Sequence, residues 1–581
     1  MTNIGGISGY RGKVVREYMK VVIVGGVAGG ATAATRIRRL DENAQIIVFE
    51  RTGYISYANC GLPYYIGGVI EDDEDLTLQT PNSFWDRFRI DVRVKQEVID
   101  INVEKKTVTV QEIENGQVYE ESYDKLILAP GARPVSPDMP GINHKRVFSL
   151  RTVEDTFQIR QFVEEYKPKS AVMVGGGFIG LEVAENLCDL GIQVTIVQRT
   201  NQLMNTLDYD MATMVHAKLR SKGIALKLGG NVIGFEEEVD SLNILLKDDV
   251  SIKTDMVLMA IGVSPETSLA KKAGLTLGIK NAVVVNDKME TSVPDIYAVG
   301  DAVSVKHSIT GSDVVIALAG PANKQGRIAA DNICGFESCY KGSMGSSVIK
   351  IFDMTVASTG ITERAAKEAG IDYDKVILSP SSHAGYYPGA KVMIMKLMFE
   401  RESLKILGAQ IVGRDGVDKR IDVIATAINA GMKANQLKDL DLAYAPPFSS
   451  AKDPVNMAGF VIENIATGRI RQFHWDELEH LPIDESITLI DTRTEKEYIS
   501  GHVKGFINIP VDDLRDRLDE IDKAKPVYVM CQSGLRSYIA CRILTQNGYD
   551  CYNFSGGYRF YESVIREKMM TEQAYPCGLD K

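Results

Sequence analysis

The clearest pattern along the chain is a short apolar run, then clustered glycines, then a stretch of small residues with helical character. Residues 20–40, "KVVIVGGVAGGATAATRIRRL", begin with the apolar Val21–Val24 and turn through Gly25 to Gly30 before the alanines. Residues 170–187, "SAVMVGGGFIGLEVAENL", repeat this order. Each stretch predicts a buried β-strand, a tight turn and an α-helix whose first N–H groups and dipole bind the phosphates of a dinucleotide.

The two glycine loops differ in how closely they match the G-x-G-x-x-G signature. The first has Val27 at the middle glycine position, but its next strand, "IIVFER", ends in Glu50, placed to bind a ribose hydroxyl. The second loop is intact, and its next strand ends in Gln198 and Arg199. An acid there favours NADH and an arginine favours NADPH, so the choice between them stays open. The candidate nucleotide-binding residues are Gly25, Gly26, Val27, Ala28, Gly29, Gly30, Glu50 and Arg51 in the first unit, and Gly175, Gly177, Phe178, Ile179, Gly180, Gln198, Arg199 and Gly262 in the second.

Composition restricts the class of protein and its partners. The 581 residues carry a net charge of −11, which argues against a nucleic-acid binder that relies on a basic surface. No apolar run reaches the roughly 18 residues that cross a bilayer. The eight cysteines lack the spacing of a disulfide framework, which suits a reducing compartment. We therefore expect a cytoplasmic protein with no nucleic-acid or membrane partner and no bound metal.

A single cysteine, Cys60, stands in the stretch "YISYANCGLPYYIGG" without a second thiol nearby. A thiolate is the reactive form of cysteine, and without a resolving thiol it pairs with an external sulfur or becomes a sulfenic acid. Cys334 and Cys339 have the spacing of a redox pair but follow no glycine turn, so we expect ordinary thiols at the end of a helix.

Two further stretches indicate a family. "LILAPGARP" (residues 126–134) and "TSVPDIYAVGDAV" (residues 291–303) resemble the later flavin-contact motifs of the pyridine nucleotide-disulfide oxidoreductase family. The resemblance implies that FAD binds the first unit, with contacts at Ala129 and Asp301, and that NAD(P)H binds the second. In the family the acid of the G-D pair bonds the ribityl chain. The resemblance also implies that a later domain of the chain forms the interface of a homodimer.

The single-cysteine branch of this family contains NADH oxidases, peroxidases and coenzyme A-disulfide reductases. "SYANCGLPYY", "HAGYYPGA" (residues 383–390) and "LAYAPPFSSAKDP" (residues 442–454) resemble the reductases. The resemblance implies that two tyrosines reach the cysteine of the opposite subunit. One is Tyr444, and the other is Tyr386 or Tyr387, with Tyr386 preferred by spacing.

Coenzyme A carries phosphates, so its site needs cations. Thr32, Arg36 and Arg39 share one face of the first predicted helix, where the arginines can form bidentate bonds to phosphate. The resemblance adds Ser56 and Asn59 as contacts that flank the reactive thiol.

The C-terminal part predicts a second sulfur site. "ITLIDTRTEKEYISGHVKGFINIP" (residues 487–510) and the later "VYVMCQSGLRSYIACRIL" resemble a rhodanese domain. An apolar strand ends at Cys531, and "CQSGLR" turns into a helix, so that successive N–H groups form an anion site that suits a thiolate or persulfide. Arg536 adds positive charge there.

These observations predict an α/β protein with two Rossmann-like dinucleotide-binding domains, for FAD and NAD(P)H, an α+β dimerisation domain and a C-terminal α/β rhodanese domain. We expect a reductase of coenzyme A disulfide, coenzyme A persulfide or polysulfide that uses Cys60 and Cys531. The alternatives are an NADH oxidase or peroxidase acting through Cys60 sulfenic acid, and a sulfide-responsive sensor or sulfur carrier. The expected divisions are an extension (1–18), the FAD-binding domain (19–150 and 270–345), the NAD(P)H-binding domain (151–269), the dimerisation domain (346–468), the rhodanese domain (469–570) and a tail (571–581).

Overall fold

The first glycine-turn unit forms the centre of a parallel sheet in the structure, a computed structural model that describes residues 18–573. The expected extension and tail therefore lie largely outside the described residues. The sheet has the order β19-β7-β1-β2-β3, and an antiparallel sheet, β4-β5-β6, follows it. Val21, Val22 and Ile23 are fully buried because helices and further strands cover both faces of the sheet. The elements are β1 (Lys20–Val24), β2 (Gln45–Glu50), β3 (Asp91–Val94), β4 (Gln96–Asn102), β5 (Thr107–Glu112), β6 (Val118–Ser122), β7 (Lys125–Leu128), β19 (Ile296–Ala298), α1 (Ala28–Leu40), α2 (Leu62–Ile66) and α3 (Pro81–Phe88).

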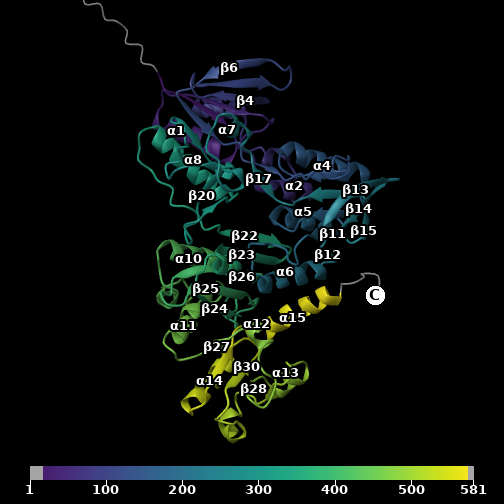
Figure 1. Cartoon of the computed structure of the whole chain (residues 1–581), viewed down its shortest axis with the longest axis vertical. Coiled ribbons are helices and arrows are strands. Elements are labelled where there is room, and N and C mark those ends of the chain that lie inside the picture. Colours follow the sequence, from purple (N-terminus) through teal and green to yellow (C-terminus); the bar gives the residue numbers. More distant parts are fainter. Residues whose placement is uncertain (1–17, 574–581) are drawn as a thin grey trace, which may run out of the picture.

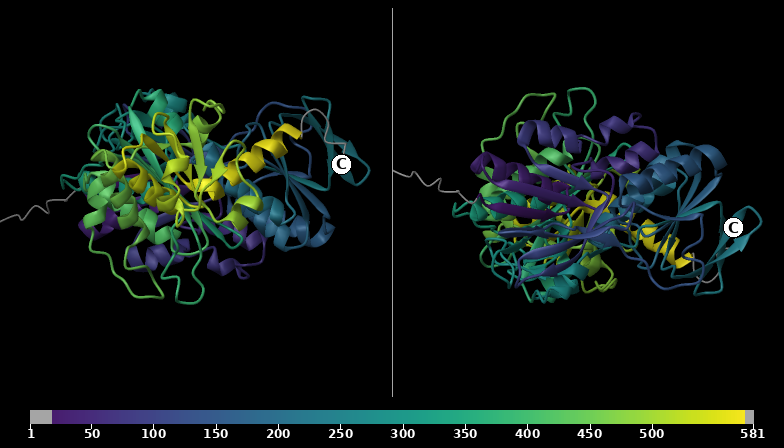
Figure 2. Two further views of the ribbon diagram at one scale, coloured as in Figure 1. Left: turned by 90° about the horizontal axis from the view of Figure 1, so that it is seen from below. Right: turned by 90° about the horizontal axis from the view of Figure 1, so that it is seen from above.

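The second unit repeats this plan. Its parallel sheet has the order β12-β11-β10-β16-β9, and the antiparallel sheet β13-β14-β15 follows. Seen along the long axis of the molecule, this unit stands to one side of the rest of the described chain (Figure 2). Its elements are β9 (Val147–Ser149), β10 (Ser170–Val174), β11 (Gln193–Gln198), β12 (Ala225–Leu228), β13 (Val232–Glu238), β14 (Ser241–Leu246), β15 (Ser251–Thr254), β16 (Met256–Met259), α4 (Val153–Tyr166), α5 (Phe178–Asp189) and α6 (Tyr209–Ser221).

After the second unit the chain crosses back to the first. Strand β17 pairs with β8 in an antiparallel ladder, β19 then joins the first sheet, and α8 packs along α1. This return brings residues far apart in the sequence onto the first dinucleotide unit. The elements of the crossing are β8 (Ala132–Pro134), β17 (Val263–Pro265), α7 (Ser268–Lys272), β18 (Val283–Val284), β20 (Val303–Lys306), β21 (Asp313–Val314) and α8 (Ala319–Ile333).

Two further parts follow below the dinucleotide units in Figure 1. The third part has an antiparallel sheet, β22-β23-β26-β25-β24, and the fourth has a parallel sheet, β27-β31-β30-β28-β29. Together with the two units above, they confirm the α/β class. The third part contains β22 (Ser347–Ile351), β23 (Met354–Gly360), β24 (Tyr373–Leu378), β25 (Ile394–Glu400), β26 (Ile406–Gly413), α9 (Glu363–Glu368), α10 (Val417–Asn429) and α11 (Pro454–Ala466). The fourth contains β27 (Gln472–Phe473), β28 (Thr488–Asp491), β29 (Ile507–Asn508), β30 (Val527–Met530), β31 (Cys551–Phe554), α12 (Trp475–Leu478), α13 (Glu495–Ile499), α14 (Leu535–Gln546) and α15 (Gly557–Gln573). Across residues 18–573, none of the helices has the length and apolar character needed to span a membrane.

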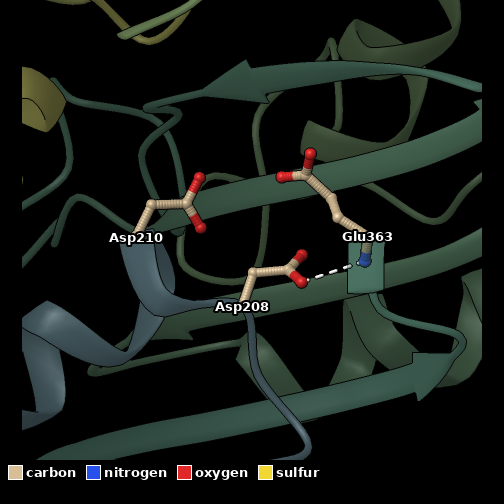
Figure 3. A group of neighbouring side chains, drawn as sticks. All are labelled: Asp208, Asp210 and Glu363. Atoms are coloured by element: carbon tan, nitrogen blue, oxygen red, sulfur yellow. Dashed lines mark hydrogen bonds between the residues drawn. The ribbon is translucent and has the colours of Figure 1, made fainter. Parts of the chain in front are cut away.

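A buried charge cluster joins the second, third and fourth parts. Figure 3 shows the carboxylates of Asp208, Asp210 and Glu363 close together, with the Glu363 N–H donating to Asp208 Oδ1 at 2.9 Å. The cation that they surround is Lys396, whose fully buried Nζ lies 2.8 Å from both Asp210 oxygens and also bonds Glu363. Trp475 of the fourth part donates to Asp210 Oδ2 at 3.1 Å. Burial lowers the pKa of Lys396, but the three carboxylates outweigh burial and raise it, so the ammonium stays charged.

Replacing this lysine tests the role of the cluster. Lys396→Met leaves buried carboxylates without their cation, and breaking a buried ion pair in this way costs about 3–5 kcal/mol. We expect the urea midpoint of unfolding to fall clearly for this variant. Lys391→Met, which changes an exposed lysine of the same part, is the matched control and is expected to stay within about 0.5 kcal/mol of the wild type. Equal midpoints for the two variants would contradict the assigned role.

Candidate active sites

The two glycine loops adopt the same close approach between backbone segments. Gly25 has φ +99°, and a Cβ there would lie 2.1 Å from the Ala129 carbonyl oxygen. Gly175 has φ +107°, and a Cβ there would lie 2.3 Å from the Ala260 carbonyl oxygen. Only glycine fits either position, because a side chain would meet both a strained backbone and a neighbouring carbonyl.

Each glycine loop is held by a hydrogen bond to the last residue of the next strand, β2 or β11. The buried Glu50 accepts the Gly26 N–H at 2.9 Å, and Gln198 accepts the Gly176 N–H at 2.9 Å. Gln198 is thus the counterpart of Glu50, while the neighbouring Arg199 is exposed. A Cβ at Gly177 or at Gly262 would meet no atom within 4 Å, so both glycines border open space beside the loop.

The remaining candidates occupy the helix starts that follow these loops. Val27 and Gly177 are the N-cap residues of α1 and α5, which begin at Ala28 and Phe178. Gly30 and Gly180 face the carbonyl oxygens of Gly25 and Gly175, respectively, so each helix approaches its own loop closely. Gly29 faces Val299, Ile179 is exposed, and Arg51 lies near Glu97 on the surface.

Asp301 offers a free acceptor near the first loop. It lies in the segment Gly300–Ala302, and its carboxylate accepts no hydrogen bond from the described residues. Burial raises the pKa of Asp301, and Arg151 partly offsets this effect. A half-buried carboxylate without a donor, beside a glycine loop that leaves room for phosphates, fits the ribityl hydroxyls and pyrophosphate of FAD.

Cys60 lies where the first and second units meet. It is exposed in the turn Asn59–Gly61, just before α2, and the preceding Ser56 donates its N–H to the Gly26 carbonyl at 2.9 Å. Ser56 thus joins the cysteine segment to the first glycine loop, while Asn59 is exposed beside the thiol. Burial, followed by the charges of Glu182 and Asp301, raises the pKa of the Cys60 thiol.

Glu182 was not among the residues predicted from the sequence. It stands on α5, the helix that follows the second glycine loop, and accepts a hydrogen bond from Tyr64 at 3.4 Å. Burial raises the pKa of Glu182 to about 7, and burial and Glu182 raise that of Tyr64 to about 12. Its place one turn into the dinucleotide-binding helix was the available sequence signal.

The third part brings two of the three candidate tyrosines together. The hydroxyls of Tyr386 and Tyr444 lie 2.7 Å apart, and Tyr386 raises the pKa of Tyr444 through this hydrogen bond. Tyr387 instead packs its ring edge-on against His383, at 5.7 Å between ring centres. Within residues 18–573, no hydrogen bond or ring contact connects these tyrosines to the Cys60 of the same chain. A cavity of about 540 Å³ beside Tyr444 is lined by residues that include Lys419, Pro447 and Phe448.

The predicted basic face of α1 lies beside α8, and together the two helices form a surface that contains α8 residues not predicted from the sequence. Thr32 Oγ1 donates to Asn323 Oδ1 at 2.8 Å, and Arg36 Nε pairs with Asp331 at 2.7 Å. Part of the Arg36 charge is therefore already compensated, whereas Arg39 is exposed. Arg327 is also exposed, one turn after Asn323 on α8. The two helices are too far apart in the sequence for spacing to have indicated this face.

Cys531 lies at the bottom of a tight turn between β30 and α14. Its fully buried Sγ accepts the Gly534 N–H at 3.1 Å and the Ser537 hydroxyl at 3.2 Å. Arg536 forms a bidentate pair with Glu497, at 2.7 Å for each bond, so its charge is shared with a carboxylate that the sequence did not indicate.

The fold and these sites define a flavin- and pyridine-nucleotide-dependent oxidoreductase. The chain belongs to the pyridine nucleotide-disulphide oxidoreductase family, which it matches over residues 19–326. The dimerisation domain of that family matches residues 346–454, and a rhodanese-like domain matches residues 474–563.

The comparisons then narrow to particular relatives. A coenzyme A disulfide reductase of Staphylococcus aureus is 38% identical over 76% of this chain and 99% of the relative. The crystal structure of reduced Bacillus anthracis CoADR-RHD is 49% identical with a TM-score of 0.93, covering 95% of this chain and 99% of the other. A NAD-dependent persulfide reductase from A. fulgidus is 38% identical with a TM-score of 0.87, covering 93% and 100%.

The electrostatics of Cys60 yield a prediction. The rate at which iodoacetamide alkylates Cys60 should rise with pH to a midpoint above that of an unperturbed cysteine, about 8.5. Glu182→Gln removes a negative charge that disfavours the thiolate, so the midpoint should move down. Peptide mass spectrometry of the alkylated Cys60 measures this, with Glu164→Gln, an exposed glutamate on α4, as the control. An unchanged midpoint in the Glu182 variant would refute the assigned electrostatic cause.

Proposed function

We propose that this chain is an FAD-dependent NAD(P)H reductase of coenzyme A disulfide, coenzyme A persulfide or polysulfide. Cys60 is the redox thiol, and Cys531 carries sulfane sulfur. The observation that carries the proposal is the position of Cys60, on a segment bonded to the first glycine loop and near Glu182 of the second unit, as a free thiol with no second cysteine bonded to it. Its reaction partner is then a sulfur from outside the protein.

The chemistry at Cys60 is thiol–disulfide exchange. The Cys60 thiolate attacks one sulfur of the substrate S–S bond, which breaks as the new S–S bond forms and releases the other sulfur as a thiolate. When bound, FAD would supply the electron pair from NAD(P)H that cleaves the mixed disulfide, so that the second substrate sulfur leaves as a thiolate and Cys60 returns to its thiolate. Tyr444 and Tyr386 donate hydrogen bonds or a proton to the leaving sulfur, and their hydroxyl pair supports Tyr386 over Tyr387.

The coenzyme A moiety is held by the basic face of α1 and α8. Arg39 and Arg327 are exposed cations that can bind phosphate, and Thr32 and Arg36 extend the same face. Ser56 and Asn59 flank the thiol and guide the sulfur end towards Cys60. Arg39 and Arg327 are exposed on adjacent helices, which suits a large acidic substrate.

The rhodanese-like domain adds a second sulfur centre. Cys531 accepts sulfane sulfur, and the Gly534 N–H and the Ser537 hydroxyl stabilise the charge of the sulfur that remains. The thiolate of coenzyme A then attacks the outer sulfur of the Cys531 persulfide, which restores the Cys531 thiolate, and the coenzyme A persulfide that forms is the substrate attacked by Cys60. The presence of both centres in one chain raises their effective concentration for each other.

The active form proposed is a homodimer in the cytoplasm. Tyr386, Tyr444 and the exposed Phe448 lie on the dimerisation domain, where the hydroxyl pair would face Cys60 of the partner subunit. The seven described cysteines are free thiols, which suits a reducing compartment.

Two cysteine variants test the proposal under anaerobic conditions. NADH and NADPH consumption is followed with coenzyme A disulfide, coenzyme A persulfide and polysulfide, and separately with oxygen or peroxide. Cys60→Ser should lose activity with all three sulfur substrates by about a thousandfold or more. Cys531→Ser should keep coenzyme A disulfide reduction and lose the turnover that needs sulfane-sulfur transfer.

The same assays separate the alternatives. Full persulfide reduction by Cys60→Ser would rule out the mechanism, and turnover only with oxygen or peroxide would indicate an oxidase or peroxidase. A single stoichiometric bleach of the flavin without turnover would indicate a sensor. If Cys531→Ser matches the wild type with every sulfur substrate, delivery through the rhodanese-like domain is wrong.

The tyrosines give a second, matched test. Tyr386→Phe should lower kcat with coenzyme A disulfide by about a hundredfold, because the leaving sulfur loses a hydrogen-bond or proton donor. Tyr387→Phe is the control on the neighbouring residue. Its kcat should stay within about twofold of the wild type, because the ring of Tyr387, not its hydroxyl, contacts His383. The reverse order of effects would assign the role to Tyr387.

A further inference from the structure

Helix α15 connects the rhodanese-like domain to the second dinucleotide unit. It begins at the Cys531 turn, where the Tyr558 N–H donates to the Cys531 carbonyl at 2.8 Å and the Arg559 N–H to the Gln532 carbonyl at 3.1 Å. Its far end packs against α6 of the second unit, and both views of Figure 2 show this helix (yellow) reaching towards that unit. A helix of the rhodanese-like domain thus packs directly against the second dinucleotide unit.

The contact between the two helices is centred on His216, which is fully buried on α6. Its Nδ1 lies 3.0 Å from Glu567 Oε1 of α15, and its Nε2 accepts the Leu203 N–H at 3.1 Å. A nitrogen that accepts a hydrogen bond carries no proton, so the proton of the imidazole is on Nδ1 and is donated to Glu567. Glu567 therefore fixes the tautomer in which Nε2 is free to accept from Leu203.

Leu203 in turn touches the second glycine loop. A Cβ at Gly176 would lie 2.2 Å from Leu203 Cδ2, so the leucine side chain lies directly against this glycine. The next residue, Met204, donates its N–H to the Gly176 carbonyl at 2.9 Å. Gly176 is also the residue whose N–H is held by Gln198. The segment of Leu203 and Met204 thus supports the loop at Gly176.

We infer that His216 is a positioning residue for the pyridine-nucleotide loop, and that Glu567, supplied by the rhodanese-like domain, holds His216 in the tautomer this role needs. The inference rests on the proposed function in one respect, that the loop around Gly176 binds NAD(P)H. His216 touches no substrate, and it acts through Leu203. Through Glu567, α15 thus contributes one contact to the support of the nucleotide loop.

Two substitutions of His216 separate its two hydrogen bonds. In His216→Asn the amide takes the place of Nδ1, so the contact with Glu567 is kept and the acceptor for Leu203 is lost. In His216→Gln the amide reaches the place of Nε2, so the acceptor for Leu203 is kept. The loss of the acceptor should raise KM and the dissociation constant for the preferred nucleotide about three- to tenfold, with kcat changed less than twofold. For His216→Gln, KM and the dissociation constant for the nucleotide should stay close to those of the wild type.

The control for helix docking is Arg220→Met. Arg220 also pairs with the Glu567 carboxylate but makes no contact with Leu203, so its loss should weaken the docking of α15 without moving the nucleotide loop. We expect both Arg220→Met and His216→Asn to lower the thermal midpoint, and only His216→Asn to raise KM for the nucleotide. Nucleotide binding to the flavin-loaded, full-length protein is measured by fluorescence titration, and KM with coenzyme A disulfide is measured alongside as the unaffected value.

The outcomes are distinct. Equal nucleotide affinity in the wild type and His216→Asn, or equal loss in His216→Asn and Arg220→Met, overturns the inference and leaves a purely structural histidine. Failure of the wild type to bind either nucleotide overturns it as well. A wild type that binds nucleotide but reduces no sulfur substrate refutes the proposed function alone, because the binding titration still decides the role of His216.

Discussion

The proposed chemistry of this protein relies on the hydrogen bond from the Ser56 N–H to the Gly26 carbonyl. This bond fixes the segment that carries Cys60 to the loop predicted to bind FAD, and α5 brings Glu182 from the other dinucleotide unit to the same place. A thiol that exchanges electrons with a flavin has to lie at this meeting point, since reaction requires the reacting atoms to be in contact. The two parallel sheets and the crossing between β8 and β17 serve to hold these loops in register.

The two sulfur centres have opposite surroundings. Cys60 lies at the surface, but partial burial and then the nearby carboxylates raise the pKa of its thiol, so in the free protein its thiolate is disfavoured. Cys531 is fully buried, and its sulfur accepts hydrogen bonds from Gly534 and Ser537. Cys60 is therefore suited to react when substrate and flavin are both in place. Cys531 is suited to hold a sulfur atom until it is transferred.

Sequence reasoning found the local structure where it is encoded in a few consecutive residues. The glycine loops, the strand ends at Glu50 and Gln198, and the turn at Cys531 were all visible as short patterns whose geometry follows from backbone sterics and helix N-termini. The fold class followed from the same patterns. The choice between Tyr386 and Tyr387 required side-chain directions, which a turn sequence does not determine.

The residues that escaped prediction are those whose partners are distant in the sequence. Glu182 acts on a cysteine of another unit, and Glu497 compensates Arg536 from the helix that follows β28. Arg36 had been assigned to coenzyme A from its helix face alone, and its bond to Asp331 became visible only when α8 was seen to lie along α1. Such pairs depend on tertiary folding, and local periodicity contains no information about them.

The rhodanese-like domain is attached rigidly to the rest of the chain. A linker would give the rhodanese-like domain freedom to move, but this domain is docked through buried polar contacts, including Trp475 with Asp210 and Glu567 with His216. Separating them would expose buried ions and leave their partners unsatisfied, which is costly. The domain is therefore a fixed part of the enzyme, and the mobile part has to be the substrate. In the proposed mechanism, a pantetheine arm whose phosphates bind α1 and α8 provides that mobility while both cysteines stay in place.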